Sequence, residues 1–493
     1  MKYKLILNNL ITLIYQIVSI LIGLFLPRFF LNAYGSDVNG LVSSITQMLS
    51  IISLLDFGIG AVVQSSLYKP LSKKNFESIS NIYCAAQKYF KLIARILIFY
   101  IIALVIYFGF IKDTGFSNMY TITLILSISL SSFAQYYFGI CNSLLLNADQ
   151  KLYITNITNL ITIILNAIFT IILIKLGANI QCVKLFSSII FILRPLIYTI
   201  YVKKHYHIKN VKNPSKDCIQ QKWHGLAQHI SSVVTNSTDY VVLTIFSTLK
   251  NVSIYNIYVM PLNSIKTLME SLSASYKSFF GKLYAENKIN ALKKEFRNYE
   301  LVTHYISVIL FSCICKVLVP FVLLYTSGIK DANYANYIFS YLITLAYAIY
   351  SLRIPYTTII FAAGHFKETQ LYCVIESLLN IILSVIFVIK YGLVGVAIGT
   401  CVGVGYRLCA SAFYLKKSII NRRYSVFLKN IFIDFLAFIL ILIATSFLKL
   451  EEITIIGWII YSVLNFIICI VVTSIIYMIF YPSFITKFIR RRN

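Results

Sequence analysis

Charge is scarce in this sequence, and negative charge is the scarcer sign. Of 493 residues only 12% are charged, with 44 Lys and Arg against 17 Asp and Glu, while 59% are hydrophobic. A soluble protein of this length could not cover so much apolar surface with so few polar groups. No long window is polar enough to form a soluble domain, so the composition places the whole chain among polytopic membrane proteins.

The sequence signatures of enzymes are also missing. It contains no HExxH, GxSxG or P-loop motif. The ten cysteines lack CxxC spacing, and we interpret them as small buried hydrophobes. The six histidines lie in or beside basic loops, which favours surface or interfacial positions over catalysis. We therefore predict no enzyme, no metal and no cofactor.

The net charge of +27 would favour nucleic acid as a partner of a soluble protein. Here the Lys and Arg residues cluster in alternate loops, and the opposite loops hold about one Lys each. This pattern predicts that both termini are cytoplasmic and that the number of spans is even. The basic segments 203–225 and 276–300 are predicted to lie as amphipathic helices against anionic membrane lipid, with no nucleic acid involved.

Long apolar runs are what the sequence has in abundance. Each is long enough to cross about 30 Å of hydrocarbon as a helix. The runs predict fourteen spans at about 8–30, 39–63, 89–111, 119–145, 154–176, 182–202, 226–247, 252–275, 301–325, 336–360, 370–389, 393–414, 427–448 and 455–480.

The first twelve spans show signs of an internal repeat. The interval from Ala148 to Gly177 equals that from Ala363 to Gly392, and the two pairs differ by an offset of 215 residues. Because six is even, six-span halves repeat in one orientation, which is typical of transporters with a site between their halves. We predict an all-α fold with a first lobe and linker at 1–222, a second lobe at 223–424, and two added helices with a basic tail at 425–493.

Ionisable residues within spans are costly and usually face a bundle interior or a water-filled path. Asp56 stands in the stretch LLDFGIG, and the offset places it opposite Ser271, beside Glu270. Two carboxylates on equivalent helices predict candidate sites for a coupling H⁺ or Na⁺, with Glu376 as a third. Arg353 matches the predicted depth of Asp56, so a buried ion pair that fixes helix packing is the alternative interpretation.

The remaining buried charges are mainly cations. A cavity lined by Arg and Lys would suit an anionic, phosphate-bearing substrate. The residues predicted to line such a cavity are Arg28, Arg194, Asp239, Lys266, Arg353 and Arg407.

The stretch Asn39–Lys74, the Pro27-Arg28-Phe29 end of the first span and the loop Ala148-Asp149-Gln150-Lys151 resemble the polysaccharide-transport (Wzx-type) flippases of the multidrug/oligosaccharidyl-lipid/polysaccharide exporter (MOP) superfamily. The resemblance implies a V-shaped pair of six-helix lobes, with spans 1, 2, 7 and 8 lining a central cavity. It favours Arg28, Asp56, Asp239, Lys266 and Glu270 as cavity residues. Lipid II flippases share the layout, but their first span usually has a Ser-Arg/Gly-rich start. The same region here reads YQIVSILIGLF, which argues against that branch.

The resemblance implies a flippase in the cytoplasmic membrane of a bacterium. Its substrate would be an undecaprenyl-diphosphate-linked oligosaccharide for O-antigen, capsule or a related polymer, and its partners a polysaccharide polymerase and glycosyltransferases. The alternative within the same fold is a cation-coupled multidrug exporter, which would favour carboxylates over the basic residues found here. A polymerase or ligase is a third hypothesis, disfavoured because every predicted outer loop is short.

Overall fold

The computed structural model describes residues 2–56, 59–209, 211, 226–448, 450 and 453–482, and these residues form helices and short connections. Most of the predicted amphipathic segment 203–225 lies outside the described residues. Contact density divides the chain into two compact units, Met1–Ser253 and Ile254–Asn493, which are described separately below.

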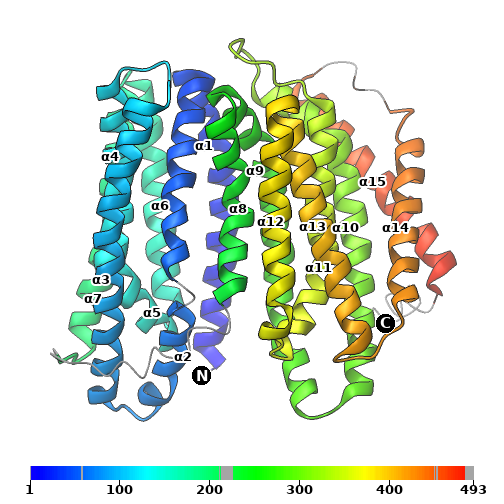
Figure 1. Ribbon diagram of the computed structural model, residues 1–493, viewed down its shortest axis with the longest axis horizontal. Helices are drawn as coiled ribbons and strands as arrows, with labels where there is room; N and C mark the ends of the chain where they lie inside the picture. The colour runs from blue at the N-terminus through cyan, green and yellow to red at the C-terminus, as the bar shows by residue number, and fades with distance from the viewer. Residues whose placement is uncertain are drawn as a thin grey trace. The chain divides into compact units, whose positions relative to one another are not determined.

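The first unit (blue to green in Figure 1) starts with a long helix that is interrupted once, at Gly35. Its elements in chain order are α1 (Lys2–Ser50), the 3₁₀ helix η1 (Ile51–Asp56), α2 (Ile59–Ser72), α3 (Phe76–Ile106), the π-helix η2 (Tyr107–Ile111), α4 (Asn118–Ala134), the π-helix η3 (Gln135–Gly139), α5 (Ile140–Ala148), α6 (Leu152–Lys175), α7 (Ile180–His205), α8 (Leu226–Phe246) and the start of α9 (Leu249–Ala285).

The apolar helix Leu10–Asp56 contains two membrane spans. Its 47 residues would reach roughly 70 Å at 1.5 Å per residue, more than twice the hydrocarbon thickness. Gly35 interrupts α1 with φ 78° and ψ 178°, a conformation open to glycine. In Figure 1 the chain rises from the N-terminus and then descends again. The first two predicted spans are therefore both present within α1 and η1.

The descending half of α1 is joined to α8 by a series of small polar contacts, which we call the α1–α8 polar ladder. Each rung joins an uncharged side chain of α1, or the backbone of η1, to a residue of α8 or the start of α9. The rungs are Asn39–Ser253 (2.8 Å), Ser44–Thr244 (2.8 Å), Ser50–Ser237 (3.3 Å) and the Ser53 carbonyl with His229 Nε2 (2.9 Å). The order of the rungs makes the two helices antiparallel.

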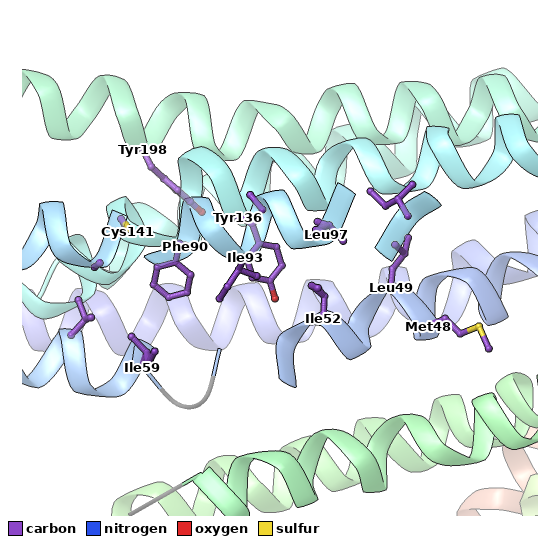
Figure 2. Packing of buried hydrophobic residues seen from close by; sticks show 14 of the residues in the cluster. Met48, Leu49, Ile52, Ile59, Phe90, Ile93, Leu97, Tyr136, Cys141 and Tyr198 are labelled. Atoms are coloured by element: carbon purple, nitrogen blue, oxygen red, sulfur yellow. The ribbon is translucent and has the colours of Figure 1, made fainter. Parts of the chain in front are cut away.

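The core of the first unit is built around α3 (Figure 2). Phe90, Ile93 and Leu97 recur at helical spacing, and each is at most 2% exposed. They share one apolar cluster with Leu49 and Ile52 of the descending chain. Inside a membrane the lipid is as apolar as these side chains, so this packing stabilises the unit through van der Waals contact.

The second unit (Ile254–Asn493) continues from α9 through six further helices. These are α10 (Ile289–Tyr325), α11 (Tyr337–Ala362), α12 (Phe366–Tyr391), α13 (Leu393–Lys417), α14 (Tyr424–Ala444) and α15 (Ile455–Phe480).

A stripe of glycines brings α12 and α13 into close contact. Gly395, Gly399 and Gly403 recur every four residues, so they lie on one face of α13. A Cβ added at Gly399 would lie 2.3 Å from Ser384 Oγ and 2.6 Å from Ser384 N. Such small-xxx-small spacing lets two helix backbones approach each other within a membrane.

The polytopic all-α fold predicted from the sequence is confirmed. Eleven of the described helices are long and apolar enough to cross a membrane. One of them is the double span described above, while α8 and α9 have 21 and 37 residues but are not among the eleven. Their polar residues account for this difference, and with these corrections the helices follow the predicted order of fourteen spans.

Segment 276–300, predicted to lie as amphipathic helices against anionic membrane lipid, is helical and continues the two helices around it. Its residues extend α9 to Ala285 and start α10 at Ile289, with a turn between them at which Asn287 has φ 53°. The helices extend beyond the predicted spans because an apolar window does not register helix turns that carry Lys and Arg, and the contact of this segment with anionic lipid stays a prediction.

The predicted domain boundaries after residues 222 and 424 stay a prediction, because compact units and sequence repeats divide a chain by different criteria. Adding the offset of 215 to the bounds of α6 gives 367–390, within α12 (Phe366–Tyr391). Adding it to α3 gives 291–321, within α10 (Ile289–Tyr325).

Candidate functional site

Five of the nine predicted site residues meet in the second unit, in what we call the α9–α13 charge cluster. It comprises Lys266 and Glu270 of α9, Tyr350 and Arg353 of α11, Glu376 of α12 and Arg407 of α13. Three cations and two carboxylates leave the cluster with an excess of positive charge.

Tyr350 is the centre of the outer part of the cluster. Its hydroxyl donates a hydrogen bond to Glu270 Oε1. Lys266 Nζ and Arg353 Cζ each lie 4.4 Å from the centre of the Tyr350 ring, within the range of cation–π attraction. The predicted neighbours Lys266 and Glu270 thus meet at one tyrosine that sequence reasoning did not single out.

Glu376 holds the inner part of the cluster together. Arg353 Nη1 donates to Glu376 Oε1, and Arg407 Nη1 lies 3.1 Å from Oε2. The Glu376 side chain is 4% exposed and that of Arg407 is 5% exposed. Arg353 therefore pairs with Glu376 within the second unit. Its alternative pairing with Asp56, a residue of the first unit, stays a prediction.

The glycine stripe of α13 explains how Arg407 reaches Glu376. Arg407 follows Gly403 by four residues and therefore extends the same face of the helix. A Cβ at Gly403 would lie 3.0 Å from the Glu376 carbonyl oxygen, which shows how closely the backbones approach at the ion pair. The close packing places a buried guanidinium beside a buried carboxylate, since neither charge is tolerated alone.

Exposure falls along the cluster from one end to the other. Glu270 is exposed and Lys266 and Tyr350 are half-buried, whereas Glu376 and Arg407 are buried. A ligand would therefore reach Lys266, Glu270 and Tyr350 first, with Arg353 behind them.

Asp56 occupies a break in helical geometry in the first unit. The chain changes from α-helix to 3₁₀ helix over Ile51–Asp56, and such changes are frequent at hinges and functional positions. Tyr136 lies 3.5 Å from Asp56 Oδ2. Among the described residues, Asp56 Oδ1 is buried without a hydrogen-bond partner. A carboxylate oxygen without a hydrogen-bond partner can accept a proton or contact a cation.

The surroundings of Asp56 come from three other helices. Tyr136 lies in the π-helix η3, where the wider turn brings its ring into the apolar cluster of Figure 2. Tyr89 of α3 donates to the Leu55 carbonyl at 2.6 Å. His229 of α8 contacts the Ser53 carbonyl through Nε2, which must carry the proton because a carbonyl only accepts.

Arg194 is a membrane-buried cation with a neutral environment. Its Nε donates to Thr162 Oγ1 at 2.7 Å, and its guanidinium lies 4.4 Å from the Phe191 ring centre. Within the described part of the chain, Arg194 forms no ion pair. Arg28 is half-buried in α1 and Asp239 is 2% exposed in α8, and both belong to the first unit, whereas the α9–α13 charge cluster belongs to the second.

The loop Ala148–Lys151, which carried part of the family resemblance, is held in place by polar contacts within the first unit. Lys151 Nζ lies 2.9 Å from Asp149 Oδ2, and Tyr206 donates to the same oxygen at 2.5 Å. Burial and this hydrogen bond raise the pKa of the Tyr206 hydroxyl. Asn8 of α1 donates to the Gln150 carbonyl at 3.0 Å, so the loop fixes the start of the first span.

Sequence reasoning also misplaced His304. It was predicted at an interface, but it is 0% exposed in α10, with Nδ1 2.5 Å from Asp434 Oδ2. The start of α10 at Ile289 puts His304 four turns inside the helix. Cys182 and Cys409 are likewise exposed rather than buried and Cys401 is half-buried, whereas the other described cysteines are buried as predicted: Cys84, Cys141, Cys313, Cys315, Cys373 and Cys469. Among the described residues no group of His, Cys, Asp and Glu could hold a metal ion.

No protein-family model and no curated protein sequence matches the chain. Solved structures do match it. The inward closed conformation of the lipid II flippase MurJ has a TM-score of 0.71 at 19% identity, covering 97% of this chain and 100% of the other. An inward-facing multidrug resistance MATE transporter of the MOP superfamily has a TM-score of 0.62 at 13% identity, covering 84% and 94%.

A MOP superfamily transporter from Pyrococcus furiosus has a TM-score of 0.56 at 12% identity, covering 85% of this chain and 95% of the other. At these identities the matches show the fold alone. They place the chain in the fold of MOP flippases and exporters, which are transport proteins, and they support a multi-pass membrane protein.

Proposed function

We propose that the chain is a flippase that moves undecaprenyl-diphosphate-linked oligosaccharides across a bacterial cytoplasmic membrane by alternating access. The observation that carries this proposal is the excess of cations over carboxylates inside the membrane, set in the fold of a lipid II flippase. A diphosphate needs cationic, hydrogen-bonding donors, and guanidinium groups match its oxygens in pairs.

In this proposal Lys266 and Tyr350 make the first contact with the diphosphate, at the exposed end of the α9–α13 charge cluster. Arg353 lies behind Tyr350, held in place by Glu376, and adds positive charge without moving. Glu376, predicted as an ion-coupling site, serves instead as the anchor of two arginines. Glu270 and Asp56 remain the candidates for H⁺ or Na⁺ coupling, because neither has an arginine bound to it among the described residues.

A cation-coupled multidrug exporter is the second candidate, and the MATE fold match favours it. An exporter of cationic drugs needs net negative charge at its site, since like charges repel in a low dielectric. The basic character of the α9–α13 charge cluster speaks for an anionic substrate.

The proposal is tested in a strain that lacks this gene. We expect surface polymer to disappear and lipid-linked repeat units to accumulate on the cytoplasmic side, with unchanged sensitivity to cationic drugs. An unchanged surface polymer together with increased drug sensitivity would establish the exporter instead. The flanking genes offer an independent check, because a flippase of this class belongs beside glycosyltransferases and a polymerase.

Arg194→Gln is expected to weaken transport of the diphosphate-linked substrate while the protein still folds. Removing one charge-assisted contact costs about 1.5–3 kcal/mol, or roughly 10- to 150-fold. Substrate uptake into proteoliposomes measures the loss, and Arg194→Lys should recover part of it. Arg95→Gln, an exposed arginine of α3, is the matched control. Equal transport by the Arg194→Gln and Arg95→Gln variants would remove Arg194 from the predicted cavity residues.

Asp56→Asn should abolish the response of transport to an ion gradient. Asn keeps the size of the side chain and can still accept from Tyr136, so the fold is expected to survive. Coupling between two binding sites typically amounts to 1–3 kcal/mol, roughly 5- to 150-fold. Transport is measured with and without an imposed H⁺ or Na⁺ gradient, with Asp113→Asn in an exposed loop as control. Gradient-driven transport at the normal rate would make Asp56 a packing residue.

A further inference from the structure

The second unit contains a basic cavity that the proposed transport site does not use. We call it the α10–α14 pocket. It has a volume of about 410 Å³, which is within the range of small-molecule sites, about 300–1,000 Å³. Its charged lining comes from α10, from α14 and from the turn before α14, and consists of Lys293, Arg297, Glu300, Arg422 and Lys429.

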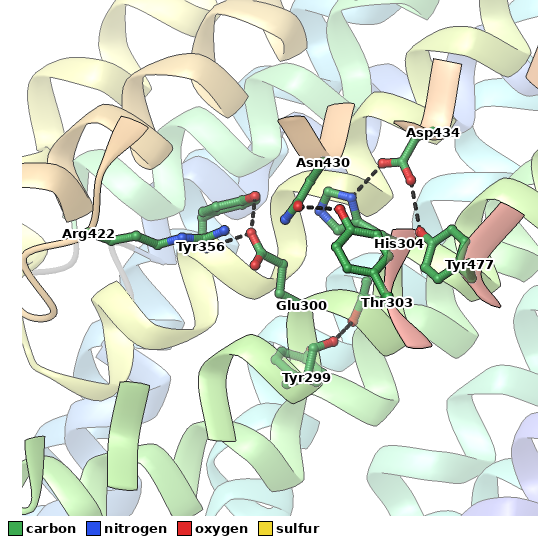
Figure 3. A network of polar contacts seen from close by, with 10 residues as sticks. Tyr299, Glu300, Thr303, His304, Tyr356, Arg422, Asn430, Asp434 and Tyr477 are labelled. Carbon is green, nitrogen blue, oxygen red and sulfur yellow. Dashed lines mark hydrogen bonds and ion pairs between the residues drawn. The ribbon is translucent and has the colours of Figure 1, made fainter. Parts of the chain in front are cut away.

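A buried network holds one wall of the pocket rigid (Figure 3). Glu300, fully buried in α10, accepts hydrogen bonds from Tyr356 of α11 and from Arg422 Nη1, the latter at 2.7 Å. One turn further along, His304 contacts Asp434, which also accepts from Tyr477 of α15 at 2.8 Å. Four helices are thereby joined by side chains that are themselves buried.

The turn between α13 and α14 aims Arg422 at the pocket. Two residues of this turn, Ile419 and Asn421, have left-handed backbones with φ 45° and 44°. A β-branched residue rarely adopts this conformation, because its side chain crowds the backbone. The Arg422 amide contacts the Leu415 carbonyl at 3.3 Å, which closes the turn. The Arg422 guanidinium then lies 5.6 Å from the Phe296 ring and keeps Nη2 buried without a hydrogen-bond partner among the described residues.

The charges of the pocket are unbalanced. Its single carboxylate, Glu300, is already engaged by Arg422. Lys293, Arg297 and Lys429 are exposed and form no ion pair within the described ranges. Four cations around one satisfied carboxylate create a site for an anion.

Apolar residues line the same cavity. Leu301, Ile420 and Val426 contribute to its wall, so an occupant would carry an apolar part beside its negative charge. Loop charge assigns these ends of α10 and α14 to the cytoplasmic surface of the membrane. A phospholipid offers both features at that depth, and basic pockets between helices on this side suit anionic head groups.

A similar cavity in the first unit supports the interpretation that the pocket is a specific feature of the fold. It has a volume of about 280 Å³ and includes Lys88 and Lys91 of α3 with Lys209, which follows α7. Adding the offset of 215 to these elements leads to α10 and to the segment after α13, which are the elements that form the α10–α14 pocket. The two cavities therefore use corresponding helices of the predicted repeat, while Lys88 and Lys91 themselves correspond to Thr303 and Ile306, outside the lining of the α10–α14 pocket.

We propose that the α10–α14 pocket binds the phosphate head group of an anionic phospholipid from the cytoplasmic leaflet. Arg422 and Arg297 bind the phosphate oxygens, Lys293 and Lys429 add charge at the rim, and the apolar wall accepts the start of the acyl chains. The site differs from the proposed transport site in residues and in helices, so phospholipid binding can be measured independently of transport.

The test is native mass spectrometry of the full-length protein in neutral detergent, titrated with phosphatidylglycerol or phosphatidylcholine. We expect phosphatidylglycerol to bind at least tenfold more tightly. Arg297→Gln/Lys429→Gln should weaken phosphatidylglycerol binding roughly 30-fold, since each cation near an anionic head group contributes roughly fivefold. Both side chains are exposed, so folding is expected to be unaffected.

Lys330→Gln/Lys390→Gln is the matched control, because it removes the same charge from exposed residues at the opposite ends of helices of the same unit. Retained phosphatidylglycerol binding by this control supports the pocket. Equal loss in both double variants would mean general charge attraction and would overturn the proposal. Displacement of the lipid by millimolar inorganic phosphate, with no preference for phosphatidylglycerol over phosphatidylcholine, would assign the pocket to free phosphate and also overturn it.

Discussion

Glu376→Gln is expected to lower the free energy of unfolding by about 3–5 kcal/mol, the range found when one partner of a buried ion pair is removed. The substitution keeps the shape of the side chain but removes the negative charge that both Arg353 and Arg407 contact. Two guanidiniums would then face each other across a neutral amide in a low dielectric. The midpoint of thermal unfolding of the purified protein in detergent measures the effect.

A second substitution separates the charge from the packing of this ion pair. In Glu376→Gln/Arg407→Gln one cation is removed together with the carboxylate, so part of the lost stability should return. Glu286→Gln, at an exposed pair with Lys288 in the α9–α10 turn, should leave the midpoint unchanged. Wild-type stability of the Glu376→Gln variant would show that the two arginines do not depend on Glu376.

Gly399→Ala is expected to destabilise the second unit by about 1–3 kcal/mol or more, as overpacking does in a well-packed core. The added methyl group would meet the backbone of α12, since Ser384 N lies 2.6 Å and Ser384 Cα 3.0 Å from its position. A backbone cannot rotate away as a side chain can, so α12 and α13 must separate. That separation should also lengthen the contact between Arg407 and Glu376, two turns further along.

Gly405→Ala on the same helix is the matched control. Nothing lies within 4 Å of a Cβ at Gly405, and alanine favours the helix by about 0.5–1 kcal/mol over glycine. This variant should therefore be neutral or slightly more stable. The midpoint of thermal unfolding in detergent is compared for the two alanine variants. Equal midpoints would contradict close packing at the glycine stripe.

The fold could be predicted because span position is a local property of the sequence. The fifth predicted span, 154–176, corresponds to α6 (Leu152–Lys175), and the eleventh, 370–389, lies within α12 (Phe366–Tyr391). The length of the apolar run alone determines where these helices lie in the sequence. Where polar turns extend a helix, as at the start of α10, the same criterion starts the span too late, and His304 was misplaced for that reason.

The partners within the site could be predicted much less well. Residue counting gives the depth of a charge in the membrane, and several helices have a charge at any one depth. The prediction for Arg353 used depth alone and chose Asp56, whereas the contact with Glu376 depends on which faces of α11 and α12 meet. Tyr350 gave no signal, because it is one of 37 tyrosines. The spacing of Gly395, Gly399 and Gly403 was a readable signal for the α12–α13 contact that carries Arg407.

The α1–α8 polar ladder has a consequence for how the protein is made. Helix α8 carries His229, Ser237 and Asp239, and it is not among the eleven helices that are apolar enough to span by composition. An Asp near the middle of a nascent helix opposes insertion by the translocon by about 2.5–3.5 kcal/mol. The descending half of α1, synthesised almost two hundred residues earlier, offers partners for the polar face of α8. Helix α8 is thus expected to enter the bilayer by docking onto a helix already inserted, which makes the order of synthesis part of the folding pathway.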